Sequence, residues 1–178
     1  MENELKELKW TTTKDGLGIE ILGFRDGFAP RRPIAVNVPT RIDGKQVVRI
    51  GEFAFKGRCD VAEIVLPDGL TEIGGGAFGY CFRLRSARLP ASVAKIGVGA
   101  FSGCTALQSL KLPEGLRAIG WRAFYNCCSL VAVALPERLA EIAQLAFDPA
   151  TILRARKGSA AERRARELGY RCEELEGV

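Results

Sequence analysis

The stretch IGVGAFSGCTALQSLKLPEGLRA, residues 96–118, decides the fold of this chain because close copies of it follow one another along the sequence. The isoleucine that begins each copy recurs every 23 residues, at Ile50, Ile73, Ile96, Ile119 and Ile142. An Ala-Phe pair begins four residues after each isoleucine, and its phenylalanines are Phe55, Phe78, Phe101, Phe124 and Phe147. A Leu-Pro pair ends twelve residues after each of the first four phenylalanines. A fixed period of this length indicates stacked supersecondary units.

Each repeat has two apolar segments that one unit alone could not bury. Residues 107–112 end in the alternation of a short strand, and Pro113 stops further pairing there. The next segment, with Leu116, Ile119 and Phe124, has the spacing of a helical turn or 3₁₀ stretch. Stacked units would bury both segments, with their strands parallel and about 4.8 Å apart.

The consensus I-G-x-x-A-F-x-x-C-x-x-L-x-x-L-x-L-P-x-x-L-x-x resembles the BspA-like class of bacterial leucine-rich repeats, and residues 50–147 follow it almost throughout. The resemblance implies an α/β repeat solenoid, a right-handed leucine-rich-repeat superhelix with a parallel concave sheet. Residues 34–49 are similar to the family's irregular first unit, with five residues inserted between Pro39 and Ile50.

Both ends of the chain are expected to cap the solenoid. Residues 10–22 predict a β-hairpin with a turn at Gly16, which would cover the edge of the first coil. Ser159 and Glu162 form a capping-box signature for a helix of about nine residues that Gly169 ends, with a short strand on either side. The family commonly ends in such a helix, so we expect the array to be complete. The expected single domain, residues 1–178, comprises a hairpin cap (1–33), an irregular first unit (34–49), four full repeats and the start of a fifth (50–147), and a strand-helix cap (148–178).

The composition excludes several classes of enzyme. The 178 residues suffice for one domain with a hydrophobic core, and their 47% hydrophobic and 26% charged content is that of a globular protein. Without histidine, the chain cannot form a Ser-His-Asp or Cys-His arrangement or a zinc site with an imidazole ligand. Gly74-x-Gly76-x-x-Gly79 matches the dinucleotide fingerprint but lacks the strand before it and the long helix after it. We therefore expect no catalytic residues, no cofactor, no metal and no enzymatic activity.

The net charge of +5 is spread evenly, with an excess of two, one and two positive charges over residues 1–49, 50–153 and 154–178. A nucleic-acid-binding surface concentrates its charge, so we do not expect a nucleic acid partner. No apolar run approaches the ~18 residues of a membrane-spanning helix, and residues 1–10 lack the apolar stretch of a secretory signal. The sequence as given predicts a cytoplasmic protein, whereas the resemblance implies a cell-surface or secreted protein as the alternative.

The six cysteines lack C-x-x-C spacing and favour a reducing compartment. Cys81, Cys104 and Cys127 each lie three residues after a repeat phenylalanine. Stacking would bring their Cα atoms roughly 4.8 Å apart, inside the disulfide range of about 4.4–6.8 Å. We interpret them as buried, reduced thiols because the pattern requires a small residue there, and disulfide pairing is the alternative.

Columns of residues that face solvent are the candidate binding sites, because the fold does not dictate their identity. On the concave sheet, Arg85, Arg88 and Lys111 cluster in the middle of the array, with Glu114 and Glu137 along the rim. We interpret this cluster as a small cationic patch that contacts an acidic segment of a partner protein. An ordinary surface of mixed charge is the alternative.

Trp121 and Tyr125 are the second candidate site. They are four residues apart and would be neighbours on the expected helical turn. Outward aromatic residues are favoured in interface hot spots. The alternative is that they merely cover the neighbouring coil or the C-terminal helix.

The leading hypothesis is a non-catalytic protein–protein interaction module that presents a rigid solenoid surface to a protein partner. The resemblance agrees, since members of the family are mostly adhesion or interaction proteins. An accessory or regulatory subunit of an intracellular enzyme complex is one alternative, and a surface adhesion module is another. A tight complex with one intracellular partner would favour the accessory subunit.

Overall fold

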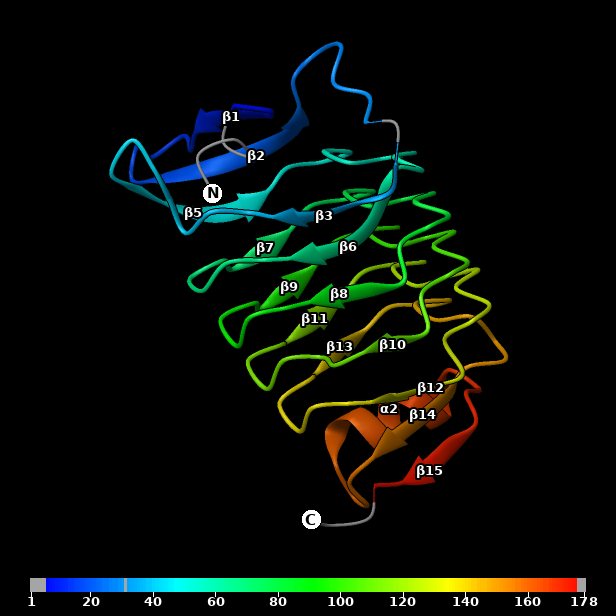
Figure 1. The fold of residues 1–178 in the computed structure, drawn as a ribbon. Helices are drawn as coiled ribbons and strands as arrows, with labels where there is room; N and C mark the ends of the chain where they lie inside the picture. The colour runs from blue at the N-terminus through cyan, green and yellow to red at the C-terminus, as the bar shows by residue number, and fades with distance from the viewer. Residues whose placement is uncertain (1–5, 31, 176–178) are drawn as a thin grey trace.

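The chain winds into a solenoid in which successive coils add strands to two parallel sheets (Figure 1). A computed structural model describes residues 6–30 and 32–175. Three parts of the chain lie outside the described residues. They are residues 1–5, which belong to the N-terminal stretch that lacks a secretory signal, residue 31 of the N-terminal cap, and residues 176–178 of the C-terminal cap. The solenoid with a cap at each end, predicted from the sequence, is confirmed.

The strands that precede the Leu-Pro pairs form the first sheet, as expected. Its order is β10-β8-β6-β3, and the strands are β3 (Ile34–Asn37), β6 (Val61–Val65), β8 (Ser86–Arg88) and β10 (Ser109–Leu110). Farther along the solenoid, a further parallel group has the order β12-β14-β15, with β12 (Ala132–Ala134), β14 (Ile152–Ala155) and β15 (Cys172–Glu174). Equivalent positions of neighbouring repeats pair, as Val65 does with Arg88, so each column of the sequence becomes a row across the sheet.

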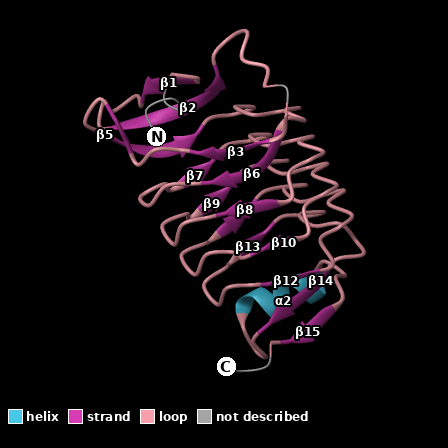
Figure 2. Cartoon of the chain, viewed as in Figure 1, coloured by secondary structure: helices cyan, strands magenta, loops and turns pink. Residues whose placement is uncertain are grey.

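The segment after each proline is not the helical turn or 3₁₀ stretch that its spacing predicts, and that expectation is wrong. A short strand there ends at the repeat isoleucine and joins a second parallel sheet. Its strands are β5 (Lys45–Ile50), β7 (Glu72–Ile73), β9 (Lys95–Ile96), β11 (Ala118–Ile119) and β13 (Glu141–Ile142). The helix α2 (Ala160–Glu167) lies in the C-terminal cap, outside the repeats (Figure 2).

The backbone of the following turns explains why no helix forms. The third residue after each isoleucine has φ between 54° and 60°, at Phe53, Gly76, Gly99, Arg122 and Leu145. The second residue after a repeat phenylalanine is also left-handed, at Gly57, Tyr80, Gly103 and Asn126. A right-handed helix cannot contain such residues. The apolar spacing instead reflects successive tight turns, in which Ala77 N donates to Gly74 O.

The N-terminal hairpin covers the end of the second sheet. Strands β1 (Leu8–Thr12) and β2 (Gly18–Phe24) are antiparallel, and β2 pairs in parallel with β5. The short strand β4 (Arg41–Ile42), within the expected insertion, folds back on β5. The hairpin predicted at residues 10–22 is therefore confirmed, and it pairs with the sheet that the sequence did not predict.

The C-terminal cap is the predicted strand, helix and strand. Ser159 Oγ accepts a hydrogen bond from Glu162 N at 3.0 Å, as in a capping box. The Glu162 carboxylate accepts a hydrogen bond from Gly158 N at 2.7 Å. In a capping box it would accept from the N-cap amide, Ser159 N, which is the next residue. Ala161 and Ala165 are fully buried, so the helix packs its small face against the core.

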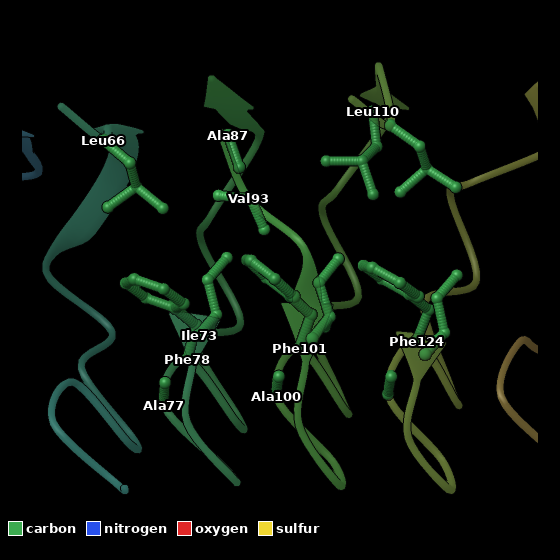
Figure 3. Close-up of a cluster of buried hydrophobic side chains, with 14 of the residues drawn as sticks. Leu66, Ile73, Ala77, Phe78, Ala87, Val93, Ala100, Phe101, Leu110 and Phe124 are labelled. Atoms are coloured by element: carbon green, nitrogen blue, oxygen red, sulfur yellow. The ribbon is translucent and has the colours of Figure 1, made fainter. Parts of the chain in front are cut away.

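A stack of phenylalanine rings runs through the core, one ring per coil. The centroids of successive rings, Phe55 to Phe147, are 5.3, 5.0, 5.3 and 5.2 Å apart. Figure 3 shows Phe78, Phe101 and Phe124 pointing the same way from neighbouring coils, beneath the aliphatic residues of the first sheet. Phe24 and Tyr170 meet the two ends of the stack edge-on, so aromatic contacts continue into both caps.

The glycine that follows the repeat isoleucine is required by the close approach of the coils. A Cβ at Gly74, Gly97 or Gly120 would lie 2.8, 2.7 or 2.6 Å from backbone atoms of the preceding coil. Contacts that short do not occur, so a side chain at these three glycines would push two coils apart. The last coil carries Ala143 at the equivalent position.

Replacing Phe101 with Ala should lower the free energy of unfolding by about 3–5 kcal/mol, because it leaves a cavity in the middle of the ring stack. Each coil supports its neighbours, so the loss should lower the midpoint of one cooperative transition in urea. Phe82→Ala is the matched control, since Phe82 is 48% exposed, and it should cost less than about 1 kcal/mol. Equal losses in the two variants would contradict the assignment of the core.

Replacing Gly97 with Ala should destabilise the protein by about 1–3 kcal/mol, because the new methyl group meets the backbone of the preceding coil. Gly75→Ala provides the control. A Cβ at Gly75 would lie 3.4 Å from the Val98 carbonyl oxygen, an ordinary contact, and should change stability by less than about 0.5 kcal/mol. Thermal denaturation of both variants measures the difference, and a stable Gly97→Ala protein would show that the coils can move apart freely.

Candidate functional site

The first candidate site is a shallow depression of about 500 Å³ on the outer face of the first sheet, which we call the sheet hollow. Its polar lining residues come from three successive strands and their ends: Glu63, Ser86, Arg88, Ser109 and Lys111. Arg88 and Lys111, which the sequence predicts to be neighbours, thus line the same depression. Arg85 and Glu114 are exposed but lie outside its lining.

The cations of the first sheet have no carboxylate partner within the described part of the chain. No Asp or Glu oxygen there lies within salt-bridge distance of Arg85, Arg88 or Lys111. Glu137, expected at the rim, is instead paired with Arg156 at 2.7 Å. Glu63 is the carboxylate that lines the hollow, and it too is unpaired among the described residues. The hollow therefore offers two free cations and one free anion to a ligand.

The second candidate site is a depression of about 350 Å³ on the turns that follow the second sheet, which we call the turn groove. It crosses four coils, and its lining residues are Glu52, Phe53, Lys56, Gly75, Gly76, Gly79, Tyr80, Val98, Gly99, Ser102, Trp121 and Arg122. Trp121 therefore lines it, whereas Tyr125 lies outside the lining.

Trp121 and Tyr125 are close together, but no helical turn brings them there. The Arg122 guanidinium lies 4.2 Å from the Trp121 ring centroid and 4.9 Å from that of Tyr125. Both rings thus make cation–π contacts with the same side chain. Arg122 has a left-handed backbone conformation. The segment from Trp121 to Tyr125 is therefore not a helical turn, and the two rings are linked through Arg122.

Sequence reasoning missed the aromatic side chains at the other end of the turn groove. Phe53 and Tyr80 both line it. A signal was present in the repeat alignment, because these two aromatic residues replace the glycine found at the equivalent positions Gly76 and Gly103. Its meaning depends on the positive φ of those positions, which the alignment alone does not show.

The three aligned cysteines are buried free thiols, as interpreted from the sequence. The thiols of Cys81, Cys104 and Cys127 donate hydrogen bonds to the carbonyls of Phe55, Phe78 and Phe101 at 3.0, 3.1 and 3.2 Å. Burial raises the pKa of Cys81 and of Cys127 to about 12, and it raises that of Cys104 further. Protonated thiols of this kind tie neighbouring coils together and are poor nucleophiles.

Within residues 6–30 and 32–175, no group of three or more Cys, Asp or Glu side chains is arranged to hold a metal ion. Among these residues no helix has the length and apolarity to span a membrane. The glycines of Gly74-x-Gly76-x-x-Gly79 lie in the turn after β7, where Gly79 N donates to Gly76 O at 2.9 Å, and no helix follows them.

The chain is similar to bacterial leucine-rich repeat proteins in sequence and in structure. Residues 40–153 match the BspA type leucine rich repeat region in six copies. The T. pallidum leucine rich repeat protein is 27% identical, with a TM-score of 0.78 over 94% of this chain and 96% of its own. A leucine-rich repeat protein from Bacteroides ovatus is 35% identical, with a TM-score of 0.72; the match covers 83% of this chain and 39% of that one. No curated protein sequence matches this chain.

A thiol reagent should label Cys59 and Cys128, which are exposed, and leave Cys81, Cys104 and Cys127 unmodified in the folded protein. The reagent needs both access to the sulfur and a thiolate. The buried thiols stay protonated at neutral and mildly alkaline pH, because burial raises the pKa of Cys81 and Cys127 to about 12. Mass spectrometry of peptides after labelling at neutral and mildly alkaline pH checks the pattern. Rapid labelling of all the cysteines without denaturant would contradict it.

Proposed function

Because the chain belongs to the BspA-type leucine-rich repeat family, we propose that it is a non-catalytic interaction module whose sheet hollow receives an acidic segment of a protein partner. The family generally mediates protein–protein interaction or adhesion. The observation that carries the proposal is that Arg88 and Lys111 line one depression without a carboxylate partner among the described residues.

The backbone beneath these cations is rigid. Arg88 ends β8, whose backbone pairs with β6 on one side and β10 on the other. Lys111 directly follows β10. A side chain on such a platform loses little backbone entropy when a ligand binds, so more of the interaction energy becomes affinity.

The charges of the hollow determine the kind of partner. An acidic segment would pair with Arg88 and Lys111, and Arg85 beside the hollow would extend the attraction. Glu63 would repel carboxylates on one side of the depression, and this repulsion would set the orientation of the acidic segment. Exposed charges of this kind act mainly through the association rate, and salt screens them beyond about 8 Å at physiological ionic strength.

Arg88→Glu should weaken binding of the native partner at least tenfold and reduce the salt dependence of the affinity, because it reverses a charge that steers the acidic segment. The partner is first captured from the source cell with the wild-type chain as bait and identified by mass spectrometry. Its affinity is then measured at low and physiological salt. A stoichiometric complex with one intracellular protein identifies an accessory subunit, and binding to surface or matrix proteins identifies an adhesion module.

Arg138→Glu is the matched control for this experiment, since it makes the same change of net charge at an exposed arginine outside the sheet hollow. It should leave the affinity unchanged. If both substitutions weaken binding equally, the effect comes from net charge alone, and the hollow is not the contact site.

A further inference from the structure

Large aromatic side chains of the turn groove are exposed to solvent. The exposed fractions are 58% for Phe53, 49% for Tyr80 and 44% for Trp121. These residues come from three different coils, so the apolar surface runs along the solenoid. A contiguous exposed apolar surface in a soluble protein marks an interaction site.

The fold does not require these aromatic residues. Phe53 and Tyr80 have φ of 57° and 60°, in the left-handed region that strains any residue with a Cβ. Glycine occupies the position of Phe53 in the next two coils, at Gly76 and Gly99, and it occupies the position of Tyr80 at Gly57 and Gly103. Arg122 and Leu145 share the column of Phe53, so the turns accept side chains at a left-handed position. Phe53 and Tyr80 place aromatic rings there, and strained positions of this kind gather at functional sites.

The two rings lie over the glycines of the following coil. A Cβ at Gly76 would meet the Phe53 ring at 2.5 Å, and one at Gly103 would meet the Tyr80 ring at 2.9 Å. The glycine thus leaves room for each ring to lean along the solenoid. The result is an apolar platform broader than the turns themselves would provide.

A cation lies over an aromatic ring at each end of the groove. The Lys56 ammonium is 5.0 Å from the Phe53 ring centroid, and the Arg122 guanidinium is 4.2 Å from that of Trp121. Neither cation has a carboxylate partner in the described part of the chain. Glu52 is the one carboxylate among the lining residues, so the groove carries a net positive charge and favours an acidic ligand.

The glycine floor has few hydrogen-bonding groups to offer. Gly76 N donates to Val98 O and Gly99 N donates to Trp121 O, both at 2.8 Å, and Gly79 N donates to Gly76 O. A ligand that needs many hydrogen bonds, such as a sugar, would leave polar groups unpaired there. A proline-rich segment has few backbone donors, and aromatic-lined grooves bind it through its polyproline II conformation.

The spacing of the rings also fits this ligand. The Phe53 ring covers Gly76, and Trp121 belongs to the coil two repeats beyond that glycine. Two coils span about 9.6 Å, and one three-residue turn of polyproline II spans about 9.3 Å. Prolines one turn apart therefore match the two-coil spacing between Gly76 and Trp121.

We propose that the turn groove binds an acidic, proline-rich segment of a partner protein in the polyproline II conformation. The prolines pack on Phe53, Tyr80 and Trp121, and the carboxylates of the segment reach Lys56 and Arg122. The proposal rests on the function of the chain as an interaction module, but it uses a surface separate from the sheet hollow.

The test measures fluorescence anisotropy with three labelled peptides, EPPEPPEPP, KPPKPPKPP and EGSEGSEGS, and the full chain. The acidic proline peptide should bind at least tenfold more tightly than the basic peptide, which lacks charge complementarity, and than the flexible acidic peptide, which lacks the preformed helix. Equal binding of the two acidic peptides, or of the two proline peptides, would overturn the proposal. Binding of a maltooligosaccharide in place of the peptides would also overturn it.

The variant Phe53→Gly/Tyr80→Gly should weaken binding of EPPEPPEPP at least tenfold while remaining folded, because glycine is the residue that other coils carry at these positions. Leu145→Gly is the matched control: it makes the same change at a left-handed position outside the groove and should leave binding unchanged. Arg88→Glu should also leave it unchanged, which separates this site from the sheet hollow. Unaltered affinity of the double variant would overturn the proposal, even if the hollow is shown to bind its own partner.

Discussion

The close stacking of one coil on the next is the constraint on which the rest of this structure depends. The amide that follows a repeat isoleucine donates to the carbonyl of the preceding isoleucine, at 2.8 Å from Gly74, Gly97 and Gly120 and at 3.0 Å from Ala143. A side chain at these glycines would collide with the coil before it. The same approach sets the spacing of the phenylalanine rings and of both sheets. Every column of the sequence consequently becomes a straight row in space.

Rows of charge show how the two sheets differ. Across the second sheet, Glu20, Arg49, Glu72 and Lys95 form successive ion pairs at 3.4, 3.5 and 3.2 Å. Glu20, Arg49 and Glu72 are partly buried in these pairs, which leaves the paired cations less available to a ligand. The cations of the first sheet have no such partners among the described residues. The first sheet therefore presents unpaired cations to a ligand, whereas the charges of the second sheet neutralise one another.

The candidate sites occur where the chain departs from its own repeat. Residues of the core stay apolar from coil to coil, and the phenylalanine of the ring stack is the same in all five coils, because the stacking buries these positions. The solvent-facing columns are free of that constraint, and there the repeats differ. Phe53 and Tyr80 are the clearest departures, since they replace glycine where the backbone favours it. Arg88 and Lys111 differ from Val65 and Ala134 of the same column in charge.

The sequence by itself determined the solenoid, its register and both caps, because these follow from a period of 23 residues and from local turn and capping signals. It also determined that the aligned cysteines are buried, since their column is fixed by the phenylalanine beside it. Only the tertiary structure decided that the segment after each proline is a strand followed by left-handed turns. Those φ values depend on hydrogen bonds to the next coil, as from Phe53 N to Gly75 O. The turn groove likewise exists only when coils are stacked, because its aromatic walls, Phe53 and Trp121, are three repeats apart in the chain.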